Sequence, residues 1–328
     1  MSSKMIYLDH AATTPLRKEV LEEMMPFLAT SYGNPSSIYS IGRESKNAVE
    51  TSREKVAKAI NANGNEIFFT SGGTESDNWA VRGTAYGNRH NGKHIITSAI
   101  EHHAVLNTCR QLEKEGFEIT YLPADEFGLI HVDQVINAVR PDTILISIMF
   151  ANNEIGTLQP IREIGKIARE KGILFHTDAV QAVGNVPVDV KELSVDLLSL
   201  SGHKFYGPKG TGVLYLKKGT KIQNHTSGGA QERNKRAGTE NVAGIVGLGK
   251  AIEIATERLE ESGEHARLLR DKAIYYILNN IPYVKLNGDA ERRLPGNVNF
   301  SFQFIEAESA IIMLDNKVGI DRKIIFCF

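Results

Sequence analysis

Short apolar runs alternate with longer amphipathic stretches along most of this chain. The runs are rich in Ile, Leu, Val and Phe with little polar alternation, which is typical of strands covered on both faces. Pro160 suits a helix start, and Gly116 and Gly172 suit helix ends. The predicted strands are 66–71, 94–99, 118–124, 143–152, 173–179 and 195–201, and the predicted helices are 74–87, 102–116 and 160–172.

This order of elements predicts an α/β fold with a mainly parallel sheet and right-handed crossovers. A binding crevice is expected where the carboxyl ends of the strands meet. After about residue 255 the pattern changes: a long helical stretch at 243–280 leads to the alternating "NVNFSF" and the helical "ESAIIMLDN". We expect a large domain of residues 15–255 and a smaller α+β domain, incomplete at its C-terminal end, made of residues 1–14 and 256–328.

Composition narrows the class of protein. The 328 residues include 38 basic and 39 acidic side chains, a near balance that argues against nucleic acid or an anionic membrane as a partner. Two cysteines, Cys109 and Cys327, are too few for a disulfide framework and fit a reducing compartment. The N-terminal residues do not resemble a signal peptide, and no apolar run approaches the length of a membrane span. A cytoplasmic protein is expected.

Two strand ends carry residues suited to a charged ligand. In "FFTSGGTES", Gly73 and Thr74 lie between a strand and a helix, where backbone N–H groups and the helix dipole favour an anion such as phosphate. The same residues are also typical of an ordinary helix cap that follows a flexible turn. Asp178 ends the apolar run "ILFHTDA", where an isolated buried carboxylate is costly, so it needs a cationic partner. A strand-end cap or a simple ion pair is the plainer explanation.

Two further strand ends carry histidines and a lysine. His102 begins a predicted helix, where a histidine is commonly a satisfied surface or core residue. Together with His103 and Cys109 it suggests a zinc site, but a further ligand is missing. The helical spacing places Cys109 on the same helix face as apolar residues, which favours packing in the core. Lys204, in "SGHKFYGPKG", is either a solvated loop lysine or an amine poised against a carbonyl.

Taken together, these four groups indicate pyridoxal 5'-phosphate (PLP). The phosphate would bind the glycine turn, the pyridinium nitrogen would face Asp178, an imidazole would cover the ring, and Lys204 would join the aldehyde. The chemistry of the cofactor requires this set of partners.

Eight motifs in order resemble those of the cysteine desulfurases, a branch of the class V aminotransferases with the type I fold of PLP-dependent transferases, as in aspartate aminotransferase. The resemblance extends from about residue 5 to residue 315. The motifs are "YLDHAATTP", "YGNPSSIYSIGRES", "TSGGTESDNWA", "EHHAVLNTC", "NNEIGTLQPI", "HTDAVQAVG", "SGHKFYGPKGTG" and "RAGTENVAGIVG".

The resemblance implies a role for each matching residue. Lys204 would bind the cofactor covalently, Asp178 would pair with the pyridinium, and His102 would stack on the ring and shuttle protons. Gln181 would bond the phenolic oxygen, and Asn153 would lie between cofactor and substrate carboxylate. The phosphate would be bound by Gly73, Thr74, Ser201 and His203, and by Thr239 of the neighbouring subunit in a homodimer.

The resemblance also implies a reaction. The family removes sulfur from L-cysteine, leaving L-alanine and a persulfide on an enzyme cysteine. The sulfur then passes to acceptor proteins, such as scaffolds for iron–sulfur clusters. Lys204 would remove the α-proton of the substrate.

The chain departs from the family pattern at its end, "MLDNKVGIDRKIIFCF". The family continues there into a Ser/Gly/Ala-rich loop with the nucleophilic cysteine and then to an arginine for the substrate carboxylate. We therefore expect a truncated chain, through a frameshift or an early stop, with little desulfurase activity. Cys327 lies between phenylalanines, a setting that disfavours a thiolate, so we do not expect it to replace the missing nucleophile.

Three alternatives remain from the sequence. One is a non-catalytic protein that retains PLP binding, and the others are a selenocysteine lyase and an aminotransferase of the same fold. The nature of the product separates the last two from a desulfurase.

Overall fold

The large sheet holds most of the strands of the protein. A computed structural model describes residues 6–314, 317–319 and 325–327. Seven of its strands form one sheet in the order β2-β8-β7-β6-β5-β3-β4. Neighbouring strands are parallel except that β8 is antiparallel to both β2 and β7. The strands are β2 Ile67–Thr70, β3 His94–Ser98, β4 Glu118–Leu122, β5 Thr143–Ser147, β6 Leu174–Asp178, β7 Leu197–Ser201 and β8 Gly212–Leu216.

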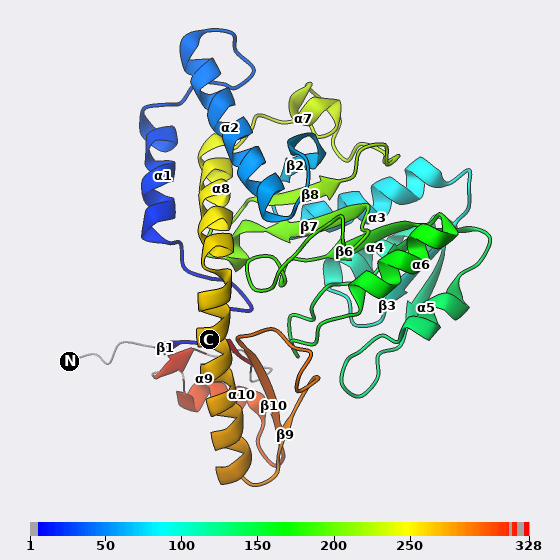
Figure 1. Cartoon of the computed structure of the whole chain (residues 1–328), viewed down its shortest axis with the longest axis vertical. Helices are drawn as coiled ribbons and strands as arrows, with labels where there is room; N and C mark the ends of the chain where they lie inside the picture. The colour runs from blue at the N-terminus through cyan, green and yellow to red at the C-terminus, as the bar shows by residue number, and fades with distance from the viewer. Residues whose placement is uncertain (1–5, 315–316, 320–324, 328) are drawn as a thin grey trace.

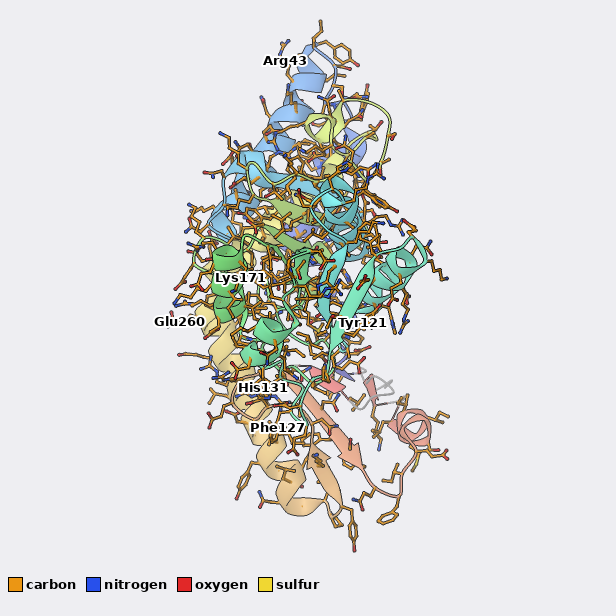
Figure 2. All side chains as sticks on the ribbon, turned by 90° about the vertical axis from the view of Figure 1, so that its right-hand side faces the viewer. Arg43, Tyr121, Phe127, His131, Lys171 and Glu260 are labelled. Atoms are coloured by element: carbon orange, nitrogen blue, oxygen red, sulfur yellow. The ribbon has the colours of Figure 1, made fainter. Side chains whose placement is uncertain are left out.

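Helices cover both faces of this sheet, which confirms the predicted α/β architecture (Figure 1). Adjacent residues of a strand point to opposite faces: Ile95 packs in a cluster with α3 and α4, whereas Ile96 packs in a cluster with α2, α6 and α8. Figure 2 shows Lys171 in α6 and Tyr121 in β4 on opposite sides of this packed region. The helices are α1 Lys18–Ala29, α2 Ser40–Ala59, α3 Gly73–Asn88, α4 His103–Lys114, α5 Val132–Ala138, α6 Ile161–Lys171, α7 Gln231–Asn234, α8 Val242–Glu257, α9 Leu259–Asn280 and α10 Ala307–Leu314.

The remaining strands form two small sheets beside the long helix α9 (Figure 1). In one, β1 Ile6–Tyr7 runs parallel to β11 Val318–Gly319. In the other, β10 Asn297–Phe302 pairs antiparallel with β9 Val284–Leu286 and with β12 Ile325–Cys327. The predicted helical stretch at 243–280 is interrupted at Arg258, which separates α8 from α9.

The apolar pattern did not predict β8. Its five residues "GVLYL" are buried, and the strand follows β7 through a short glycine-rich loop instead of a crossover helix. A search for alternating strands and helices passes over such an antiparallel insertion. Among the described residues, no helix is both long and apolar enough to cross a membrane.

Candidate active site

The carboxyl ends of β2, β3, β5, β6 and β7 meet at one edge of the sheet, around a cavity of about 390 Å³. Ligand pockets usually have volumes of about 300–1,000 Å³. Every residue that the sequence predicts for the site, except Thr239, lines this cavity. The lining is formed by Ala11, Ala12, Gly73, Thr74, Asp77, His102, Met149, Ala151, Asn153, Asp178, Val180, Gln181, Ser201, His203 and Lys204.

Lys204 lies at the wall of the cavity, in the short 3-10 turn η2 (Gly202–Lys204) that follows the buried strand β7. Its half-buried amine donates hydrogen bonds to the carbonyl oxygens of Ala11 and Ala12, the latter at 2.9 Å. The Gln181 amide donates to the same Ala11 oxygen at 3.0 Å. The N-terminal segment thus holds the amine in place, a role that the sequence analysis did not assign to it.

Asp178 is the last residue of β6, and the residue is only 6% exposed. One carboxylate oxygen, Oδ1, accepts a hydrogen bond from the Val180 N–H at 2.9 Å. Burial raises the pKa of this carboxyl, and the Val180 N–H and the charge of Lys204 only partly counter it. A cationic group that enters the cavity beside Asp178 therefore stabilises its ionised form.

The glycine turn joins β2 to the start of α3. Gly72 has φ 154° and ψ 179°, a conformation open essentially to glycine alone. The first hydrogen bond across the turn runs from the Ser76 N–H to the Gly72 carbonyl (3.1 Å), so the N–H groups of Gly73 and Thr74 have no acceptor within the helix. A methyl group on Gly73 would approach Val180 Cγ2 to 2.7 Å. The exposed backbone and the helix dipole make this turn an anion site.

The two predicted histidines contribute neutral rings. His102 is the N-cap of α4, and its Nδ1 accepts a hydrogen bond from the Ala104 N–H at 3.1 Å. Burial lowers its pKa, with a smaller contribution from Lys204. His203 Nδ1 lies 3.0 Å from Thr13 Oγ1, and burial with the charges of Lys204 and Lys209 lowers its pKa to about 4. An uncharged imidazole is suited to stacking on an aromatic ring.

Thr239 does not belong to the cavity of its own chain. It is exposed on the loop after α7. Its contact with the phosphate of a neighbouring subunit, which the family resemblance implies, stays a prediction.

A buried polar layer beneath the cavity was missed by the sequence analysis. His176 and Asp178 are two residues apart on β6 and point to the same face of the sheet. His176 contacts Ser147 Oγ (2.8 Å), Ser199 Oγ (3.0 Å) and Asp77 Oδ1 (3.6 Å). Burial lowers the pKa of His176 to about 3. Asp77 lies four residues after Gly73 on α3, so the two residues share one face of the helix. This spacing is the sequence signal from which Asp77 could have been predicted as a site residue.

Two buried carboxyls therefore accompany Asp178. Burial raises the pKa of Asp77 well above its usual value, and the charge of Asp178 adds to this effect. Burial also raises the pKa of Glu101 to about 8, even though Glu101 Oε1 accepts hydrogen bonds from Ser98 Oγ (2.6 Å) and the Met149 N–H (2.8 Å). Burial thus favours the protonated form of both carboxyls, whereas the charge of Lys204 favours the ionised form of Asp178.

Cys109 packs in the core, as its helical spacing predicts. It clusters with Val105 and Leu112 and is fully buried, and burial raises the pKa of its thiol to about 12. Among the described residues, no group of three or more His, Cys, Asp or Glu side chains is arranged to bind a metal ion. The Cys327 side chain, on which one expectation depended, lies outside the described residues.

The residues present fit PLP. The cavity offers an amine (Lys204) for an aldehyde, a buried carboxylate (Asp178) for a pyridinium nitrogen and a neutral imidazole (His102) for the ring. Its glycine turn offers unpaired backbone N–H groups for a phosphate. A second hollow of about 370 Å³ borders this turn and includes Lys209. The fold and the cavity together define a PLP-dependent transferase of fold type I.

Comparison with known proteins agrees with this class. Residues 6–322 match the family described as Aminotransferase class-V. "Cysteine desulfurase IscS" of Methanosarcina thermophila is 61% identical over 315 residues, which cover 96% of this chain and 78% of that protein. The protein of the same name from Clostridium botulinum is 59% identical, with 95% and 79% covered. The chain therefore belongs to the class V aminotransferases, in their cysteine desulfurase branch.

Solved structures show the same relationship. One described as a "NIFS-LIKE PROTEIN" has a TM-score of 0.95 at 38% identity, covering 99% of this chain and 94% of that one. Another, described as "SspA in complex with cysteine", has a TM-score of 0.85 at 38% identity, with 97% and 89% covered.

Proposed function

We propose that this protein uses PLP to remove sulfur from L-cysteine, which leaves L-alanine. The observation that carries this proposal is the convergence of the Lys204 amine, the buried Asp178 carboxyl and the glycine turn on one cavity. The names of the relatives and the cysteine complex of SspA support L-cysteine as the substrate.

Each residue of the cavity has a chemical task in this proposal. PLP, when bound, withdraws electrons from the α-carbon of an amino acid that is joined to it. Lys204 Nζ removes the α-proton, and Ala11 and Ala12 orient this amine before the reaction. Asp178 would pair with the protonated ring nitrogen, and His102 would cover the ring and shuttle protons.

The remaining predicted residues bind and orient. Gln181 would bond the phenolic oxygen of the cofactor, and Asn153 would contact the substrate carboxylate; both residues line the cavity. The backbone of the glycine turn and nearby side chains would hold the phosphate. These phosphate-binding residues are Gly73, Thr74, Ser201 and His203, with Thr239 of a neighbouring subunit.

The sulfur step requires a thiolate. The thiolate attacks Sγ of the substrate, a sulfur–sulfur bond forms and the substrate carbon–sulfur bond breaks. Protonation of the remaining carbon fragment completes L-alanine. Cys109 is unsuited to this role because it is buried outside the cavity and its thiol has a pKa of about 12. The accepting thiol is therefore not among the side chains that the structure describes.

The proposal includes a setting. We infer that the protein acts in the cytoplasm as a homodimer and passes sulfur to acceptor proteins, such as those that assemble iron–sulfur clusters. The free thiol of Cys109 fits a reducing compartment.

Exchange of the α-proton tests the proposal without requiring the accepting thiol. We expect the PLP-loaded protein in D₂O to incorporate deuterium at the α-carbon of L-cysteine, measured by NMR. Lys204→Ala should lower this rate by about 100-fold or more, because general base catalysis contributes about 10²–10⁴-fold. Gln223→Ala, a change outside the cavity, is the control. Exchange that persists in Lys204→Ala, or its absence from the loaded wild-type protein, would contradict the proposal.

A second candidate is a PLP-binding protein that does not transfer sulfur. It is favoured by the lack of an accessible thiol at the cavity among the described side chains. Deuterium exchange without formation of alanine from L-cysteine would support this second candidate.

A further inference from the structure

A loop with an unusual backbone lies beside the glycine turn. Glu232, Arg233 and Asn234 have φ values of 45°, 57° and 63°, a run of left-handed conformations in residues other than glycine. Such conformations are unfavourable and persist where surrounding contacts fix them. Figure 1 shows this segment, labelled α7, next to β2 and β8.

Buried contacts fix the loop to the strand that precedes the glycine turn. The Glu232 carboxylate accepts hydrogen bonds from both terminal nitrogens of Arg53, at 2.8 and 2.9 Å, and from the Phe69 N–H at 2.9 Å. The Arg53 and Glu232 side chains are only 4% and 3% exposed. A buried bidentate pair of this kind has a strongly preferred geometry.

A second ion pair reaches the turn itself. Arg236 Nε and Nη2 donate to the two carboxylate oxygens of Glu75, at 2.8 and 3.1 Å. Glu75 lies in the first turn of α3, and its Oε2 also accepts from the Ser71 N–H at 2.8 Å. Burial raises the pKa of Glu75, but the hydrogen bonds and the Arg236 charge outweigh it and lower the pKa overall. Glu75 is therefore an anion at the turn.

The charge of Glu75 conflicts with the proposed ligand. Glu75 lines the hollow beside the glycine turn, where a phosphate would be the second anion. Two anions in a partly buried site repel each other. Arg236 neutralises Glu75, and it lies only three residues before Thr239.

We propose that Arg236 is a positioning residue that cancels the charge of Glu75, so that the glycine turn accepts a dianionic phosphate monoester. This inference rests on the proposed function and adds a residue to its phosphate site. It makes a specific claim: loss of Arg236 weakens binding of a phosphate group and not of the ring.

The test compares binding of PLP and of pyridoxal, which has no phosphate, to four purified proteins. These are the wild type, Arg236→Gln, the double variant Glu75→Gln with Arg236→Gln, and Arg233→Gln. Arg233 is the matched control, because it lies on the same loop and bonds backbone oxygens of Gly64, Asn65 and Ile67 instead of Glu75.

We expect Arg236→Gln to weaken PLP binding by about tenfold or more and pyridoxal binding by less than about twofold. The double variant should recover most of the loss, because it removes the repelling charge. Arg233→Gln should stay within about twofold of the wild type. Equal losses for PLP and pyridoxal, no loss in Arg236→Gln, or no recovery in the double variant would each overturn the proposal.

Inorganic phosphate separates this inference from the proposed function. Its binding, measured by calorimetry, should follow the same order among the variants. A wild-type protein that binds no PLP would refute the proposed function, whereas the phosphate measurement would still decide the role of Arg236.

Discussion

At the residue scale, the site contains three buried carboxyls, Asp77, Glu101 and Asp178, and burial raises the pKa of each. Asp77 and Glu101 are buried without a cationic partner among the described residues, and burial raises the pKa of each. Asp178 is buried too, but the charge of Lys204 favours its ionised form. Nearby positive charge thus favours ionisation of Asp178 over ionisation of Asp77 and Glu101.

Glu101 gives a prediction about pH. Its pKa is about 8 in the folded protein against 4.5 normally, so between these values the folded state binds more protons than the unfolded state. Stability therefore falls as pH rises from about 4.5 to about 8, by up to about 5 kcal/mol. Glu101→Gln should remove this pH dependence. The free energy of unfolding of the variant, relative to that of the wild type, should therefore increase with pH.

Urea unfolding at pH 5, 6, 7 and 8 measures the effect. Glu126→Gln, at an exposed turn residue, is the control and should follow the wild-type curve. A Glu101→Gln curve parallel to that of the wild type would show that Glu101 is ionised in the fold.

Most of the site residues were predictable because each lies at the end of a buried strand or within a few residues after it, and these strand ends meet at one edge of the sheet. Lys204 and Asp178 are examples. The carbonyl oxygens of Ala11 and Ala12 were not predictable, since backbone atoms have no sequence signature and this contact spans more than 190 residues. Asp77 was missed because it faces the sheet from the interior of a helix.

At the element scale, the site depends on the close approach of α3 to the loop after β6. Gly73 begins α3, and its Cα faces Val180 with no room for a side chain. The sequence predicted this glycine turn. It did not predict β8, which lies between β2 and β7 and sets the distance between the glycine turn and Lys204.

Gly73→Ala should weaken PLP binding by about tenfold, because the added methyl group would lie 2.7 Å from Val180 Cγ2 and displace the turn. Val180→Ala in the same protein removes that methyl contact and should restore part of the affinity. Equilibrium dialysis with PLP measures both variants. Unchanged affinity in Gly73→Ala would show that the turn does not carry the phosphate.

At the scale of the whole molecule, we propose that residues 15–255 form the PLP-binding unit and that residues 1–14 with 256–328 form the smaller one. The chain pattern suggested this division through the change near residue 255. The position of Thr239, exposed and outside its own cavity, further suggests that a complete site needs two subunits.

Mixing two inactive variants tests the two-subunit site. Lys204→Ala and Thr239→Ala should each exchange the α-proton poorly. Hybrid dimers contain one site with both residues intact, so random reassociation should restore about one quarter of the wild-type rate. A mixture no faster than its separate components, or full activity in Thr239→Ala alone, would contradict a shared site.

The proposed function depends on one amine, Lys204, which would react with the aldehyde of PLP in this cavity. Its most direct test is borohydride reduction of the PLP-loaded protein, followed by peptide mapping by mass spectrometry. We predict a pyridoxyl phosphate label on Lys204 and no label in the Lys204→Ala protein. A label on a different lysine, or an unlabelled wild-type protein in the presence of excess PLP, would exclude Lys204 as the residue that binds the cofactor.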